Sequence, residues 1–66
     1  MTKPFISLRK HTILELIANG YTAREIADKL SYSYSMIRKD LDELFIETET
    51  NNQAHLISWA YQNGIL

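Results

Sequence analysis

The chain has 66 residues, 45% of them hydrophobic and 23% charged, with a formal net charge of −1. A chain of this size forms one small domain at most, and the absence of cysteine excludes disulfides and thiolate zinc sites. No apolar run approaches the ~20 residues of a membrane-spanning helix, and the N-terminus lacks the pattern of a signal peptide. We therefore expect a cytoplasmic protein with a single domain over residues 1–66.

The first helix is predicted over residues 8–19. Ser7 can cap its start, and the apolar residues from Ile13 to Ala18 recur at helical spacing. Gly20 supplies a stop, because glycine readily adopts the left-handed backbone conformation that follows many helices.

A second, shorter helix is predicted over residues 23–30. Thr22 and Glu25 form a capping-box pattern, in which a hydroxyl and a carboxylate satisfy two backbone N–H groups at the helix start. Ile26 and Leu30 belong to a short apolar stripe. An isolated helix of about two turns is not stable in water, so this segment must pack against its neighbours.

Residues 34–47 are predicted to form the third and longest helix, with Ser33 as its N-cap. Its inward face is marked by apolar residues at helical spacing: Ile37, Leu41, Leu44 and Phe45. Its outward face then carries Ser35, Lys39, Asp42 and Ile46, with Arg38 on the flank.

A fourth helix is predicted over residues 52–63, opened by Asn51 or Asn52 and ended at Asn63-Gly64. Most of its circumference is apolar, through Ala54, Leu56, Ile57, Trp59, Ala60 and Tyr61. A surface helix needs an apolar stripe of only about 100°. We therefore expect these six residues to provide a dimer interface as well as core contacts.

The second helix, the brief Leu30–Ser33 turn and the third helix have the proportions of a helix-turn-helix, whose second helix lies in the major groove of DNA. Arginine can form a bidentate contact with guanine, lysine can reach guanine or a phosphate, and groups at a helix start favour phosphate. The residues predicted to bind DNA are Thr22, Tyr32, Ser33, Tyr34, Ser35, Arg38, Lys39 and Asp42. The same pattern also fits a solvated surface on which Arg38 and Lys39 pair with Asp42 and Glu43.

Charge divides between the two parts of the chain. Residues 1–39 hold all seven basic residues and three acids, whereas residues 40–66 hold five acids and no Lys or Arg. An acidic surface expected around Asp40, Asp42 and Glu43 favours a second hypothesis, a protein-binding modulator that pairs with another transcription regulator. Such a modulator would use the helix at 52–63 or this acidic face.

Four segments carry a family pattern in register: ILELIANG (13–20), TAREIADKL (22–30), SYSMIRKDL (33–41) and AYQNGIL (60–66). They resemble the LuxR/GerE family of four-helix DNA-binding domains, without a gap from about Ile6 to Leu66. The resemblance implies an all-α, four-helix bundle with a helix-turn-helix. It also implies a sequence-specific transcription regulator of a bacterium or phage, associated with the nucleoid, and the chain is expected to be a small stand-alone member. In that family the third helix enters the major groove, with Arg38 at the position of a DNA-contacting Lys, and the fourth helix commonly mediates dimerisation.

Two positions depart from the family pattern. Asp40 stands where the family has His, and Asp42 stands where a basic residue is common. The predicted helix 34–47 carries Arg38 and Lys39 against four acids. Because neutralisation of phosphates supplies much of DNA affinity, we expect weaker intrinsic DNA binding than in a typical member. Asp42 can instead accept a hydrogen bond from cytosine, or hold the guanidinium of Arg38.

Other kinds of site find little support in the sequence. His11 and Glu15 have i,i+4 spacing, but no third metal ligand is evident, so we expect a surface pair. No nucleophile with a base is visible, and Trp59 and Tyr61 are expected in a core or interface rather than in a ligand site. We predict no enzymatic activity, metal, cofactor or small-molecule ligand. The expected partners are double-stranded DNA and a second copy of the chain, with another transcription regulator or RNA polymerase as further candidates.

Overall fold

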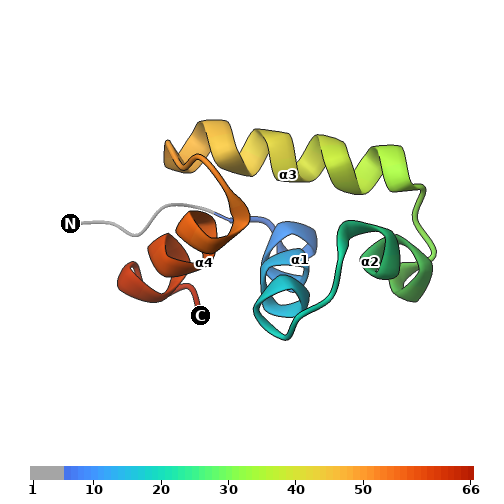
Figure 1. The fold of residues 1–66 in the computed structure, drawn as a ribbon, viewed down its shortest axis with the longest axis horizontal. Helices are drawn as coiled ribbons and strands as arrows, with labels where there is room; N and C mark the ends of the chain where they lie inside the picture. The colour runs from blue at the N-terminus through green and yellow to red at the C-terminus, as the bar shows by residue number, and fades with distance from the viewer. Residues whose placement is uncertain (1–5) are drawn as a thin grey trace.

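A computed structural model describes residues 6–66, which form four helices: α1 (Leu8–Ala18), α2 (Ala23–Leu30), α3 (Tyr34–Thr48) and α4 (Gln53–Gln62) (Figure 1). The all-α, four-helix fold predicted from the sequence is confirmed, and no predicted helix end differs from the structure by more than one residue. α3 is the longest helix and packs against each of the other three (Figure 1). α4, α1 and α2 lie side by side beneath it, with α1 in the middle.

Each helix begins at a side chain that accepts a hydrogen bond from the backbone N–H three residues further on. The caps are Ser7, Thr22, Ser33 and Asn52. The predicted capping box of α2 is present, since the Thr22 backbone N–H donates to Glu25 Oε1 at 2.8 Å and the Glu25 N–H donates to Thr22 Oγ1 at 3.2 Å. Local sequence therefore sets where every helix starts.

Each helix also ends in a common way, with a residue of positive φ just after it. These residues are Gly20, Ser31, Glu49 and Gly64. After each of them, the next backbone N–H donates to the carbonyl five residues back; the pairs are Tyr21 to Leu16, Tyr32 to Ala27, Thr50 to Phe45 and Ile65 to Ala60. This is the bond of a Schellman motif, which satisfies helix-terminal carbonyls and turns the chain toward the next element.

One hydrophobic core joins all four helices. Its buried residues are Ile13, Leu14 and Ile17 of α1, Ala23, Ile26 and Ala27 of α2, Ile37, Leu41 and Leu44 of α3, and Leu56 and Ala60 of α4. Phe45, predicted to face inward, is partly buried against this core. Because α3 contributes its full inward stripe to the core, its rotation about its own axis is fixed, and so is its outer face.

The junction between α3 and α4 is closed by two buried threonines. Thr48 Oγ1 donates to the Leu44 carbonyl at 2.7 Å, and the hydroxyls of Thr48 and Thr50 are 2.9 Å apart. Among the residues that the structure describes, no buried side-chain nitrogen or oxygen lacks a hydrogen-bond partner. Within residues 6–66, none of the helices has the length and apolar character needed to cross a membrane.

Candidate DNA interface

The outer face of α3 presents a polar stripe away from the core. Ser35, Lys39 and Asp42 are exposed, and Arg38 is half-buried on the flank. At the C-terminal end of the same stripe, Ile46 is 77% exposed. The structure thus places all of the predicted base-contacting side chains on one accessible side of one rigid helix.

Arg38 and Asp42 form an ion pair across one helical turn, with Arg38 Nη2 at 3.4 Å from Asp42 Oδ1. This distance agrees with the suggestion that Asp42 holds the Arg38 guanidinium. The second i,i+4 pair considered from the sequence, Lys39 with Glu43, does not form, because Glu43 instead binds Lys10 of α1 at 3.1 Å. Lys39 therefore keeps its place on the outer stripe, beside Arg38.

The turn that leads into α3 gathers the predicted phosphate-binding hydroxyls. Tyr32, Ser33 and Tyr34 are all exposed there, and Thr22 is exposed at the start of α2. Ser33 Oγ accepts from the Met36 N–H at 3.1 Å. Its own O–H remains able to donate, as a hydroxyl has one donor and two acceptor positions. Tyr32, Ser33 and Tyr34 lie at the positive end of the α3 dipole, which favours an anion.

Two arginines outside the predicted set of DNA-binding residues lie beside these tyrosines. The Arg24 guanidinium is 4.7 Å from the centre of the Tyr34 ring, and the Arg9 guanidinium is 5.8 Å from the centre of the Tyr32 ring. Both distances are typical of cation–π contacts. Arg24 could have been found from its place in the first turn of α2, because the first helix of a helix-turn-helix crosses the DNA backbone in known complexes. Arg9 could not, because no local pattern connects α1 with residue 32.

Asp40 is not part of an acidic surface, contrary to the prediction. It is 1% exposed and faces α1. Arg9 reaches across from α1, with Nε at 2.7 Å from Asp40 Oδ2 and Nη2 at 3.0 Å from Oδ1. This bidentate hydrogen bond and the charge of Asp40 raise the pKa of Arg9 above its ordinary value. The acidic face proposed for a protein-binding modulator therefore loses one of its three residues.

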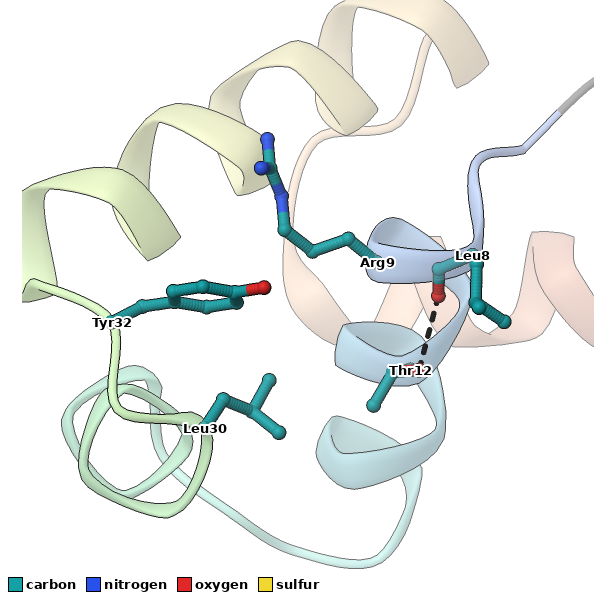
Figure 2. A pocket seen from close by; sticks show the side chains of 5 residues that line it. All are labelled: Leu8, Arg9, Thr12, Leu30 and Tyr32. Carbon is teal, nitrogen blue, oxygen red and sulfur yellow. Dashed lines mark hydrogen bonds between the residues drawn. The ribbon is translucent and has the colours of Figure 1, made fainter.

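Figure 2 shows how Arg9 spans the gap between α1 and α3. It lines an open hollow together with Leu8, Thr12, Leu30 and Tyr32. The Thr12 hydroxyl donates to the Leu8 carbonyl at 3.0 Å, so it is used within α1. The lining combines apolar stems with one ion-paired guanidinium, and it contains no nucleophile beside a base.

The predicted dimer-interface residues divide between core and surface. Leu56 and Ala60 are completely buried inside the chain. Their assignment to an interface is wrong, because they cover α1 and α3 and offer no area to a partner. Ala54 and Tyr61 are exposed, whereas Ile57 and Trp59 are partly buried. Ala54 and Ile57 border a shallow groove with Ile17 and Ala18 of α1.

His11 stands in a structural position. Its Nε2 is 2.9 Å from the Ile65 carbonyl, and its Nδ1 is 3.4 Å from Glu15 Oε1. The ring thereby ties the C-terminal segment to α1, as a surface pair with one added contact. Within residues 6–66, no three His, Cys, Asp or Glu side chains are grouped as metal ligands would be.

Known proteins resemble the chain over most of its length. Probable transcriptional regulator ycf29 of Cyanophora paradoxa is 33% identical over 58 residues, which make up 88% of this chain and 28% of that protein. Response regulator Rre1 of Synechocystis sp. is 33% identical over 57 residues, 86% of this chain and 25% of that protein. The crystal structure of response regulator ChrA, of a heme-sensing two-component system, matches with a TM-score of 0.91 and 23% identity. That match covers 100% of this chain and 33% of ChrA.

The chain thus spans between 25% and 33% of the length of these proteins. No family model matches it. The likeness to ChrA shows the fold, and the sequence matches include a probable transcriptional regulator and an HTH-type transcriptional regulator. Helix-turn-helix domains of this kind are not enzymes. The chain therefore belongs to the LuxR/GerE-type helix-turn-helix domains that transcriptional regulators carry.

Proposed function

We propose that the chain binds double-stranded DNA in a sequence-specific manner, with α3 in the major groove, and thereby regulates transcription. The observation that carries this proposal is the outer stripe of α3, where Lys39 is exposed and the half-buried Arg38 lies on the flank of a helix whose inward face is used by the core. Because the helix is already formed and packed, it can present its side chains to base edges without the loss of conformational entropy that ordering the segment on binding would cause. Such a role would place the protein at the nucleoid.

Each part of the surface has its own role in this proposal. Arg38 makes a bidentate contact with guanine, and Lys39 reaches a guanine or a neighbouring phosphate. Asp42 orients Arg38 through the 3.4 Å ion pair. The hydroxyls of Tyr32, Ser33, Tyr34, Ser35 and Thr22 contact phosphates and fix the register on the duplex. Arg24, stacked on Tyr34, is added to this set as a further phosphate contact.

We further propose that two copies bind together, through α4 and the adjacent part of α1. The exposed side chains Ala54 and Tyr61, with Ile57 at their edge, share one side of α4. Ala18 of α1 lies beside the same groove. A symmetric pair in this arrangement would read two half-sites of a two-fold symmetric operator, about one DNA turn or a multiple of it apart.

The experiment that tests the proposal is selection from a library of random duplexes at several salt concentrations, with Arg38→Ala as the decisive variant. We expect a preferred sequence and a symmetric site, with affinity falling as salt rises because phosphate contacts release counterions. Arg38→Ala should cost about 1–3 kcal/mol and relax the preference at one base pair of each half-site. Ile46→Ala, on the same stripe but near the far end, is the matched control and should change the preference little.

A protein-directed role is the second candidate, and the same experiment separates the two. It now depends on α4 and the groove beside α1, because Asp40 is buried and Glu43 is paired with Lys10. If the folded wild-type chain selects no duplex even at low salt, the DNA proposal fails. Pairing with another transcription regulator would then be the function to test.

A further inference from the structure

α3 is an acidic helix on what we propose to be the DNA-facing side of the molecule. It carries Arg38 and Lys39 against Asp40, Asp42, Glu43 and Glu47. Negative charge near phosphates is repulsive, and the repulsion is strongest at low ionic strength. A recognition helix with this composition therefore needs compensation from elsewhere in the molecule.

The compensation comes from α1, through Lys10. Its Nζ is 3.1 Å from Glu43 Oε1, and it lies 3.2 Å and 3.3 Å from the two carboxylate oxygens of Glu47. One ammonium group thus bridges two carboxylates that are one helical turn apart. Burial acts to lower the pKa of Lys10, but the hydrogen bonds and charges of the two glutamates outweigh it and raise the pKa. Lys10 is accordingly charged at any physiological pH.

Glu43 borders the stripe that faces away from the core. It lies one turn after Lys39 on α3, and its side chain is 44% exposed. Glu47 continues the same flank, one turn further on. Phosphates that pass along this side of α3 would meet both carboxylates, so their charge state bears directly on the approach of DNA.

We propose that Lys10 is a positioning residue for DNA binding: it neutralises and holds back Glu43 and Glu47, and so lets an acidic recognition helix approach the phosphate backbone. This inference rests on the proposed function. Lys10 acts here without touching DNA, because its side chain is only 13% exposed and its ammonium is occupied by the two carboxylates. The three residues are brought together by the fold alone, since Lys10 and Glu47 are 37 positions apart.

The test compares four proteins on the duplex that the wild-type chain selects: wild type, Lys10→Met, the double variant Glu43→Gln/Glu47→Gln, and the triple variant that combines them. Methionine keeps most of the apolar stem of Lys10 and removes its charge. We expect Lys10→Met to weaken binding about three- to tenfold at low salt, and the difference to shrink as salt screens the charges. In the triple variant the loss should disappear, because no carboxylates remain to be neutralised.

Lys29→Met serves as the matched control. It removes the same charge from an exposed residue of α2 that lies over Tyr21, in the turn between α1 and α2. That turn is on the side of the molecule opposite α3 (Figure 1). Lys29→Met should reduce DNA affinity clearly less than Lys10→Met does. Thermal unfolding of each variant gives its folded fraction, and the affinity is calculated from the concentration of folded protein.

Each outcome decides between specific readings. A triple variant as weak as Lys10→Met would show that Lys10 itself touches phosphate, and would overturn the inference. An affinity loss that follows the unfolded fraction and ignores salt would reduce Lys10 to a structural residue. Wild-type binding with no effect of Lys10→Met would refute the inference alone, whereas no duplex binding by any of the proteins would refute the proposed function and the inference with it.

Discussion

Asp40 was expected on the surface of the protein, but the fold buries it. On a helical wheel it is one of four acids on α3, yet in the fold it is 1% exposed and fully engaged by Arg9. A buried carboxylate is tolerated only when its charge and its lone pairs are matched. Arg9 supplies both, and its guanidinium also lies over the Tyr32 ring at the entrance to α3.

Arg9→Met should therefore destabilise the fold, because it leaves the buried Asp40 carboxylate without its partner. The Asp40 carboxylate would keep its buried place without a donor, at a cost of about 1–3 kcal/mol. Urea unfolding followed by circular dichroism measures the difference. Arg24→Met, which removes an exposed arginine that is stacked on Tyr34, should change stability by less than about 0.5 kcal/mol.

The double variant Arg9→Met/Asp40→Leu tests the reason for the loss. In this ion pair only the carboxylate is buried, and replacing both members by apolar residues leaves no unmatched charge inside the fold. We expect most of the stability lost in Arg9→Met to return. If the double variant is less stable than Arg9→Met alone, the cost arises from lost packing rather than from the unmatched carboxylate.

At the scale of the elements, the four helix ends share one hydrogen-bond pattern, and two of them hold a non-glycine residue at positive φ. All four helices are followed by a left-handed residue and a backbone bond to the carbonyl five residues back. Gly20 and Gly64 adopt this conformation freely. Ser31 and Glu49, with φ of 59° and 56°, adopt it against the preference of L-residues. The two strained ends are those that flank α3, the helix on which the proposed function depends.

Glu49→Gly should relieve this strain and stabilise the protein by about 0.5–1 kcal/mol. For a domain of this size, that corresponds to a rise in Tm of about 2–8 °C. Thermal unfolding at neutral pH measures it. Glu49→Ala separates backbone from charge, because alanine removes the carboxylate and keeps the strain, so it should not reproduce the gain.

Gly20→Ala provides the opposite comparison. Its φ is +93°, and a Cβ added there would meet no atom within 4 Å. Any loss of stability therefore comes from the backbone conformation alone. If Glu49→Gly and Gly20→Ala were both without effect, left-handed strain would not contribute to the stability of these helix ends.

At the scale of the whole molecule, α3 contacts all three other helices, and α1 binds it through both apolar and charged side chains. The described chain extends about 36 × 21 × 19 Å, and α3 contacts α2, α1 and α4. The core fixes α3 by its apolar stripe, and Arg9 and Lys10 fix it by charge. Because one helix contacts every other element, its position depends on the complete fold, and the surface proposed for DNA exists only in the folded chain.

The two faces of α4 should respond differently to substitution. Leu56→Ala removes a fully buried side chain from the core and should cost about 2–5 kcal/mol, which is enough to unfold much of a small domain. Ala54→Glu places a charge on the exposed side and should leave the monomer folded while weakening paired binding to a symmetric duplex. Sedimentation velocity with and without this duplex distinguishes one bound copy from two. Paired binding by Ala54→Glu that equals the wild type would contradict the proposed dimer surface.

Much of the fold was predictable from local sequence. Capping side chains and apolar spacing indicate where each helix starts, and the two glycines mark the ends of α1 and α4, because these signals act within one helical turn. The exposed residues of the proposed DNA surface were also predictable, since the inward stripe of α3 leaves only one side outward. In α4, Leu56 and Ala60 are buried, whereas Ala54 and Tyr61 are exposed. This division was not predictable, because apolar character alone does not show which neighbouring element covers a residue.

By itself, then, the sequence determined the helices, the helix-turn-helix arrangement and the family, all of which depend on short-range patterns. Only the tertiary structure decided which charged side chains of α1 and α3 form ion pairs. Arg9 binds Asp40 across 31 positions, and Lys10 binds Glu47 across 37. Electrostatic attraction depends on distance in space rather than along the chain, so no reading of helix 34–47 by itself could show that its acids are matched from α1.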